Sequence, residues 1–178
     1  MHHSDSATVT TVDTLAKLLD VCGELRASEQ VDERAVTGCS FDSRAVSAGD
    51  VFFCKGAAFK PAFLSMALDA GAEWLEVGTP LLYQYGHEAI GMLRRSVGKA
   101  VKLVADYKSP FATLCAEQAA RQGADFVMLS VGYNDWALEK NFADCRAAGI
   151  EPIFDLAVRQ DDLYPTIRKL VARGGTYM

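Results

Sequence analysis

The sequence predicts an α/β fold built on a parallel sheet, and three observations support this. From residue 63 onward, strand-like and helix-like patterns alternate about every 25 residues, as βαβ units do. The strand-like runs are largely apolar, which is typical of a parallel sheet covered on both faces. Most helix-like segments end in a glycine, which suits the left-handed conformation that closes helices: Gly71, Gly98, Gly123, Gly149 and Gly174.

The patterns give the expected elements in order. Helices are predicted at residues 63–72, 86–98, 111–123, 135–149 and 161–174. Strands are predicted at residues 73–82, 100–108, 124–132 and 150–158, with a further strand at 175–178. Two architectures fit this alternation, an open doubly wound sheet and a (β/α)8 barrel. Because a complete barrel needs about 200 residues or more, this chain could form only part of one.

The first 60 residues differ in kind from the rest. An amphipathic helix is expected at residues 12–25, followed by a charged turn at 26–34 and by short β-like pieces broken by glycines. We therefore predict a boundary near residues 57–62, with one part at 1–60 and a second at 61–178. In an alternative interpretation, residues 50–56 form the first strand leading into the helix that follows.

Composition narrows the classes of function. Half of the 178 residues are hydrophobic and 23% are charged, which favours a folded core over disorder. The net charge of −5 argues against a nucleic-acid-binding protein, and no apolar run approaches the ~20 residues of a membrane span. The five cysteines are dispersed without a Cys-x-x-Cys pair, so we expect reduced thiols and the cytoplasm: Cys22, Cys39, Cys54, Cys115 and Cys145.

Polar side chains stand where the expected strands end, at Glu76, Asp106, Lys108 and Asp155. In both architectures, ligands bind at this edge of the sheet. Asp106 and Lys108 are two positions apart, so on an extended strand their side chains point to the same face. The pair is interpreted either as part of an active site or as a simple ion pair at the sheet edge.

Other side chains are assigned to packing or to the surface. Cys54 lies in an apolar run and is expected in the core. His87 follows Gly86 and is expected at a helix N-terminus on the surface. Three aromatic residues are expected at the barrel mouth or at a partner contact: Tyr83, Tyr85 and Trp136.

The runs Glu-Val-Gly-Thr-Pro at residues 76–80 and Asp-Tyr-Lys at 106–108 resemble 3-hexulose-6-phosphate synthase and 3-keto-L-gulonate-6-phosphate decarboxylase. These enzymes are (β/α)8 barrels of the orotidine-phosphate decarboxylase superfamily, and the resemblance covers residues 63–178. It implies that Glu76 and Asp106 bind Mg²⁺ and that Lys108 stabilises an enediolate. It also implies a ketose phosphate substrate, such as hexulose 6-phosphate. Thr79 of the matching motif is a candidate to bind this substrate, as is Asp155, which ends a strand in the right place for a lining residue. The family motif continues Asp-x-Lys-x-x-Asp, and Phe111 stands at the second acid.

The segment from residue 42 to residue 56 resembles the N-terminal domain of the Mur ligases, closest to the UDP-N-acetylmuramoyl-tripeptide synthetases. The residues that match the family pattern are Asp42, Ser43, Arg44, Gly49, Asp50, Phe53 and Gly56. The resemblance covers residues 12–72 and implies that Ser43 and Arg44 contact a uridine nucleotide. The glycine-rich ATP loop of the ligases appears nowhere in this chain, so peptide-bond synthesis by this chain alone is not expected.

Two hypotheses of function follow. The first is a Mg²⁺-dependent carbon–carbon lyase acting on a ketose phosphate, or a degenerate descendant of one. The alternative is a non-catalytic module that binds a UDP-sugar through residues 38–60. A third possibility is an incomplete polypeptide whose exposed sheet edges need another chain. Because open parallel edges invite pairing, a homodimer or larger homo-oligomer is expected.

Overall fold

The structure is a computed structural model, and it describes residues 38–54, 59–131, 134–156 and 163–175. The chain divides into two compact units, Met1–Ala35 and Val36–Met178, and all described residues belong to the second. The helix expected at residues 12–25 and the turn expected at 26–34 lie outside the described residues, as does most of the strand expected at 175–178.

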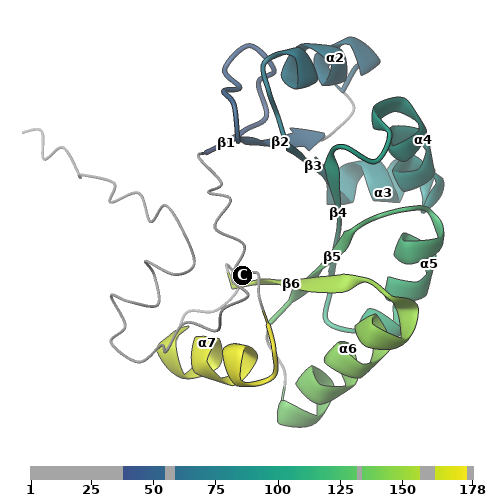
Figure 1. The fold of residues 1–178 in the computed structure, drawn as a ribbon. Helices are drawn as coiled ribbons and strands as arrows, with labels where there is room; N and C mark the ends of the chain where they lie inside the picture. The colour runs from purple at the N-terminus through teal and green to yellow at the C-terminus, as the bar shows by residue number, and fades with distance from the viewer. Residues whose placement is uncertain (1–37, 55–58, 132–133, 157–162, 176–178) are drawn as a thin grey trace, which may run out of the picture. The chain divides into compact units, whose positions relative to one another are not determined.

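Six parallel strands form one sheet in the described part of the chain, and their order along the sheet is their order in the sequence (Figure 1). Each strand pairs with the one before it, without the reversal of a doubly wound sheet. The strands are β1 (Cys39–Ser40), β2 (Val51–Cys54), β3 (Trp74–Val77), β4 (Lys102–Ser109), β5 (Phe126–Ser130) and β6 (Glu151–Asp155).

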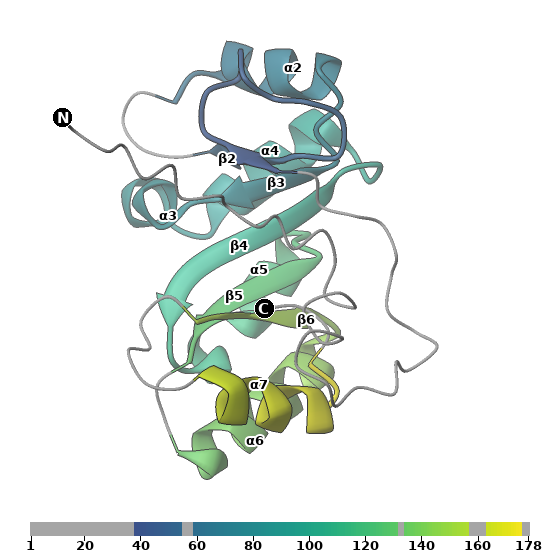
Figure 2. The same cartoon turned by 90° about the vertical axis from the view of Figure 1, so that its left-hand side faces the viewer.

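The helices pack on one face of this sheet. They are α2 (Pro61–Asp69), α3 (Thr79–Tyr85), α4 (Glu88–Val97), α5 (Ala116–Arg121), α6 (Asp135–Ala148) and α7 (Leu163–Ala172), with a 3₁₀ turn η1 (Ala112–Leu114). The main core joins Leu75 and Val77 of β3 to side chains such as Ile90 of α4 and Phe142 of α6. Figure 2, seen from the open side of the sheet, shows the strands running side by side with α4 and α5 behind them. Sequential order with helices on one face is the winding of a (β/α)8 barrel, so the fold is a partial barrel-like α/β structure.

The opposite face of the sheet carries a second, smaller apolar cluster of Trp74, Val104 and Phe126. The rings of Trp74 and Phe126 lie with their centroids 5.0 Å apart. Since side chains alternate along a strand, Glu76 shares the face of Trp74, and Asp106 shares the face of Val104. The candidate residues are therefore on the face that the helices leave open.

Strand β2 lies in the segment that resembles the Mur ligases, and it pairs in parallel with β3 of the lyase-like part, with Phe53 opposite Glu76. The two segments that carry these resemblances therefore contribute strands to one continuous sheet. The connection passes through α2, as the alternative interpretation of residues 50–56 expects. This helix is closed at Gly71, whose φ is 95°, and a Cβ there would lie 3.1 Å from the Cα of Ala48.

Two expected elements differ from the structure. The strand expected at residues 73–82 ends at Val77, and α3 begins at Thr79 because extended Gly78 and early Pro80 start a helix. The helix expected at 111–123 is shorter, since Cys115, with φ −137°, separates η1 from α5. Within the described residues, no helix combines the length and apolar character needed to span a membrane.

Candidate active site

Glu76 and Asp106 bring two carboxylates together at the C-terminal ends of β3 and β4. Glu76 is opposite Val104 in the β3–β4 register, so Asp106 lies two residues further along the neighbouring strand. Both residues are buried, with exposed fractions of 9% and 3%. Burial first, and then the negative charge of Asp106, raises the pKa of Glu76 to about 7. Near neutral pH, the Glu76 carboxyl is therefore close to the midpoint between its protonated and its charged form.

Lys108 places its ammonium between two carboxylates. Its Nζ lies 2.6 Å from Oδ2 of Asp155, at the end of β6, and 3.5 Å from Oδ2 of Asp106. Burial alone would lower the pKa of Lys108, but the hydrogen bond to Asp155 and the charges of Asp106 and Asp155 raise it. The ammonium is thus held in its charged form. We call Glu76, Asp106, Lys108 and Asp155 the carboxylate–lysine cluster.

The end of β4 is not a regular strand. The β4–β5 register shifts between Asp106 and Ser109, and Lys108 adopts a left-handed backbone with φ 51°. Its backbone N–H donates to Oδ1 of Asp106 at 3.3 Å. The simple alternation expected from the sequence therefore fails at this point, although the Lys108 ammonium still reaches Asp106.

Thr79 joins the cluster from the first turn of α3. Its Oγ1 lies 2.9 Å from the backbone oxygen of Asp106 and 3.0 Å from Oδ2 of the same residue. Because the chain turns at Gly78 straight into a helix, Thr79 stands directly above the end of β3. This contact orients the Asp106 carboxylate toward Glu76 and Lys108.

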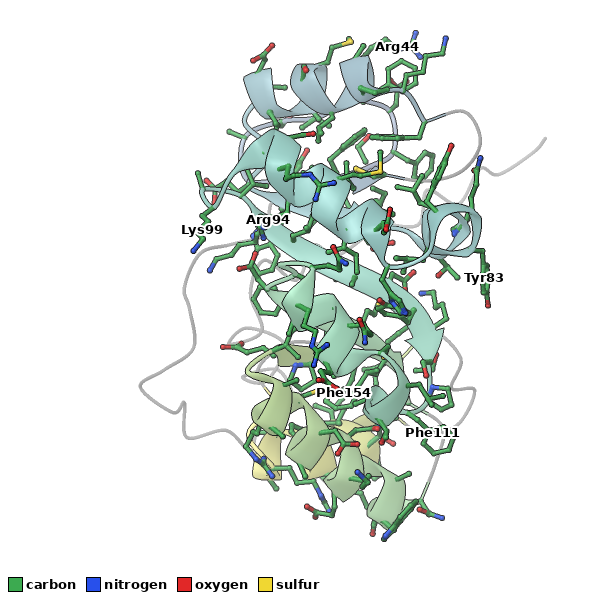
Figure 3. All side chains as sticks on the ribbon, turned by 90° about the vertical axis from the view of Figure 1, so that its right-hand side faces the viewer. Arg44, Tyr83, Arg94, Lys99, Phe111 and Phe154 are labelled. Atoms are coloured by element: carbon green, nitrogen blue, oxygen red, sulfur yellow. The ribbon has the colours of Figure 1, made fainter. Side chains whose placement is uncertain are left out.

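The loop after β4 is fixed by a buried amide on α6. Asn141, only 4% exposed, donates from Nδ2 to the oxygen of Pro110 at 2.9 Å and accepts from the N–H of Ala112 at 2.9 Å. Phe111 lies between them with its side chain 36% exposed. Figure 3 shows Phe111 and Tyr83 projecting at the same edge of the molecule, with Arg94 and Lys99 at the other.

His87 and Tyr107 form a pair that the sequence did not indicate. His87 precedes α4, as expected, but it is half-buried, and its Nδ1 lies 2.5 Å from Oη of Tyr107. Nothing in the sequence joins residues that are 20 positions apart on a helix and a strand. Strand alternation indicates only that Tyr107, between Asp106 and Lys108, turns its side chain toward the helices; it does not indicate which helical residue it meets. Cys54 is fully buried in the core, as expected.

Ser43 and Arg44 lie apart from the cluster, on the connection between β1 and β2. Ser43 is only 6% exposed, and its Oγ lies 3.8 Å from Sδ of Met66 on α2. Arg44 is exposed and makes two hydrogen bonds to the carboxylate of Asp42, at 2.9 and 2.7 Å. A ligand that used Nε and Nη2 of Arg44 would therefore have to displace Asp42.

The donor set at the cluster fits a hard divalent cation. Two buried carboxylates of adjacent strands repel each other, and a cation between them would relieve that repulsion. No group of three or more His, Cys, Asp or Glu side chains within the described residues is arranged to hold a metal. A magnesium ion here would therefore rely on Glu76 and Asp106, with its remaining positions filled by water or substrate oxygens.

Fold and site together describe a barrel-type α/β protein with charged groups at the strand ends, and solved structures with this fold are similar to it. One is 3-hexulose-6-phosphate synthase from Salmonella typhimurium (TM-score 0.61, 21% identity, covering 70% of this chain and 60% of that one). Another is KGPDC from Streptococcus mutans (TM-score 0.51, 23% identity, 57% and 50%). At these identities, the likeness shows the fold.

Among curated proteins, the UDP-N-acetylmuramyl-tripeptide synthetase of Lacticaseibacillus paracasei is 38% identical over 80 residues, which is 45% of this chain. That of Lactobacillus acidophilus is 40% identical over 65 residues. This chain spans only 14% and 12% of the length of these relatives. No protein-family model matches the chain.

Proposed function

We propose that this chain is a Mg²⁺-dependent carbon–carbon lyase acting on a ketose phosphate such as hexulose 6-phosphate. The observation that carries the proposal is the Lys108 ammonium held between Asp106 and Asp155, with the buried Glu76 carboxyl close to Asp106, at the C-terminal ends of β3, β4 and β6. In barrel-type folds, ligands bind at this edge. The likeness in fold to 3-hexulose-6-phosphate synthase supports this proposal.

The chemistry needs a fixed positive charge next to the reacting carbons. Loss of formaldehyde breaks a bond beside a ketone while a base takes the proton of the departing hydroxymethyl group, and loss of carbon dioxide breaks such a bond from an ionised carboxylate. In both cases the bonding electrons stay on the larger fragment as an enediolate. A proton then completes the product. The Lys108 ammonium, kept charged by Asp155 and Asp106, would stabilise the negative charge of the enediolate as it forms. Thr79 would keep Asp106 in place, while Asp155 would line the substrate site.

When bound at Glu76 and Asp106, Mg²⁺ would supply further positive charge at the same place. The two carboxylates would hold it, and the pKa of Glu76, about 7, implies that binding releases a proton at neutral pH.

Formaldehyde trapping tests the proposal. Incubation of the protein with hexulose 6-phosphate and Mg²⁺ should release formaldehyde at a rate that falls at least about 100-fold in Asp106→Asn. Glu151→Gln is the matched control, because Glu151 is an exposed acid at the opposite end of the strand that carries Asp155. Absence of formaldehyde from the wild-type protein would reject this function.

A second function is favoured by the matches to the tripeptide synthetases. In this alternative, the chain binds a UDP-sugar without catalysis, and Arg44 exchanges its pairing with Asp42 for the nucleotide phosphates. Calorimetry with UDP-N-acetylmuramoyl ligands should then give heat that disappears in Arg44→Ala and persists in Arg95→Ala. Ser43→Ala tests whether Ser43 contacts the ligand. Loss of the heat would indicate a direct contact, and unchanged heat would indicate that Ser43 only packs against Met66. Equal heat in the wild-type protein and Arg44→Ala would reject the alternative.

We also propose a homodimer in the cytoplasm. Within the described residues, β1 and β6 are the outer strands of the sheet. Four cysteines of these residues are free thiols, in keeping with a reducing compartment: Cys39, Cys54, Cys115 and Cys145. Light scattering tests the assembly, and a strictly monomeric protein would contradict it.

A further inference from the structure

The end of β4 has a backbone geometry that costs free energy. Among the described residues other than glycine, Lys108 alone has a positive φ, 51°. The register of β4 on β5 passes from Asp106 to Ser109, so Tyr107 and Lys108 fall outside the pairing. A residue with a side chain is strained in this conformation, which persists only where the surrounding structure holds it.

We call this irregular end of the strand, with its register shift after Asp106, the β4 bulge. The helices α3 and α4 contact it at two consecutive residues, Asp106 and Tyr107. Thr79, at the start of α3, contacts the backbone oxygen and carboxylate of Asp106. His87, just before α4, contacts the hydroxyl of Tyr107 at 2.5 Å, with ring centroids 5.5 Å apart. Burial raises the pKa of Tyr107, so its hydroxyl keeps its proton and remains a partner for the imidazole.

We propose that His87 is a positioning residue, which acts through Tyr107 to hold the β4 bulge and thereby keeps the Lys108 ammonium against Asp155. Tyr107 and Lys108 are consecutive residues whose side chains point to opposite faces of the sheet. Tyr107 points toward the helices, and Lys108 points toward the carboxylate–lysine cluster. If the Tyr107 ring moves, the peptide between the two residues rotates and Lys108 leaves the left-handed region. The catalytic part of this inference rests on the proposed lyase function, and the geometric part does not.

Amide hydrogen exchange at position 108 tests the geometry without any substrate. The backbone N–H of Lys108 is hydrogen-bonded to Asp106 only while the bulge is intact. In Tyr107→Phe and His87→Ala, its exchange should become at least about tenfold faster. In Tyr83→Phe, which removes the hydroxyl of an exposed tyrosine on α3, it should not change. His87→Gln, which retains a hydrogen-bonding group, should lie between wild type and His87→Ala.

Lys108→Gly provides the rescue. Glycine adopts a positive φ without strain, so Tyr107→Phe should have little effect on exchange at position 108 in this background. If Tyr107→Phe accelerates exchange equally with and without Lys108→Gly, the His87–Tyr107 pair is only packing and the inference is wrong. Unchanged exchange at position 108 in both Tyr107→Phe and His87→Ala would also overturn it.

Turnover separates this inference from the proposed function. With an active wild-type protein, Tyr107→Phe should lower kcat about tenfold while KM stays within about twofold, because only the ammonium at the reacting atoms is displaced. The double variant with His87→Ala should be no slower than the slower single variant. If the wild type shows no turnover but the exchange results hold, the lyase function fails and the positioning role stands. If turnover is present and unaffected by either variant, the positioning role fails alone.

Discussion

The Nζ of Lys108 lies 2.6 Å from Oδ2 of Asp155, closer than to Asp106, which lies only two residues before it. Lys108 and Asp155 are 47 positions apart, and β5 runs between their strands. The Asp155 side chain is only 11% exposed and the Lys108 side chain is 47% exposed, so solvent reaches the pair from the side of the lysine. It is the contact that joins the end of β6 to the Glu76–Asp106 pair.

Asp155→Asn should lower the pKa of Lys108. Burial lowers this pKa, and the hydrogen bond to Asp155 is the largest influence that raises it, followed by the charges of Asp106 and Asp155. NMR titration of the Lys108 side chain measures the change directly, with Glu151→Gln as the control. An identical Lys108 pKa in wild type and Asp155→Asn would show that the ion pair does not form in solution.

The stability of the metal-free protein should fall as pH rises through the range in which Glu76 titrates. Its folded-state pKa, about 7, lies above the ordinary 4.5, so the folded protein keeps a proton that the unfolded chain has released. The stabilisation is therefore fully present below pH 4.5 and is lost as pH rises to about 7.

Urea unfolding in EDTA measures this effect. The free energy of unfolding of the wild type relative to Glu76→Gln should fall across that range by on the order of 3 kcal/mol. Parallel pH profiles of wild type and Glu76→Gln would contradict the raised pKa of Glu76. Glu151→Gln, at an exposed position, should follow the wild-type profile.

Asn141→Ala should destabilise the protein by about 2 kcal/mol, because it leaves the Pro110 oxygen and the Ala112 N–H without their partner. Lys140→Ala removes a surface ion pair with Asp144 on the same helix and should cost less than about 1 kcal/mol. Denaturant unfolding compares the two variants. Equal effects would mean that the loop after β4 does not depend on Asn141.

Lys108→Met should separate charge stabilisation from metal binding. It removes the ammonium from the cluster, so formaldehyde release should fall by about 100-fold while Mg²⁺ still binds. Lys102→Met is the matched control, because Lys102 begins the same strand at the opposite edge. Full turnover in Lys108→Met would remove Lys108 from the mechanism.

The alternation of strands and helices could be predicted from the sequence because it depends on local patterns. Glycines such as Gly149, with φ 69°, close helices where expected. The strand order and the single helical face were not determined by these patterns, since both architectures share them. The start of α3 was missed because the apolar run after Pro80 looked like a strand, although an early proline is itself a signal for a helix start.

The candidate site was predictable only in part. Glu76, Asp106 and Lys108 stand at strand ends in recognisable motifs, so their positions could be inferred. The bulge at Lys108, the His87–Tyr107 contact and the Asn141 bridge arise from tertiary contacts between distant segments. No local pattern encodes such contacts, because each needs the packing of a helix against the end of β4.

Glu76 and Asp106 are proposed to form one cation site, and calorimetric titration with Mg²⁺ tests this central claim most directly. We predict binding to the wild-type protein that strengthens as pH rises through about 7, because Glu76 must lose its proton. We also predict at least about tenfold weaker binding in Glu76→Gln and in Asp106→Asn, and unchanged binding in Glu151→Gln. Equal Mg²⁺ affinity in the wild type and in both site variants would contradict the claim.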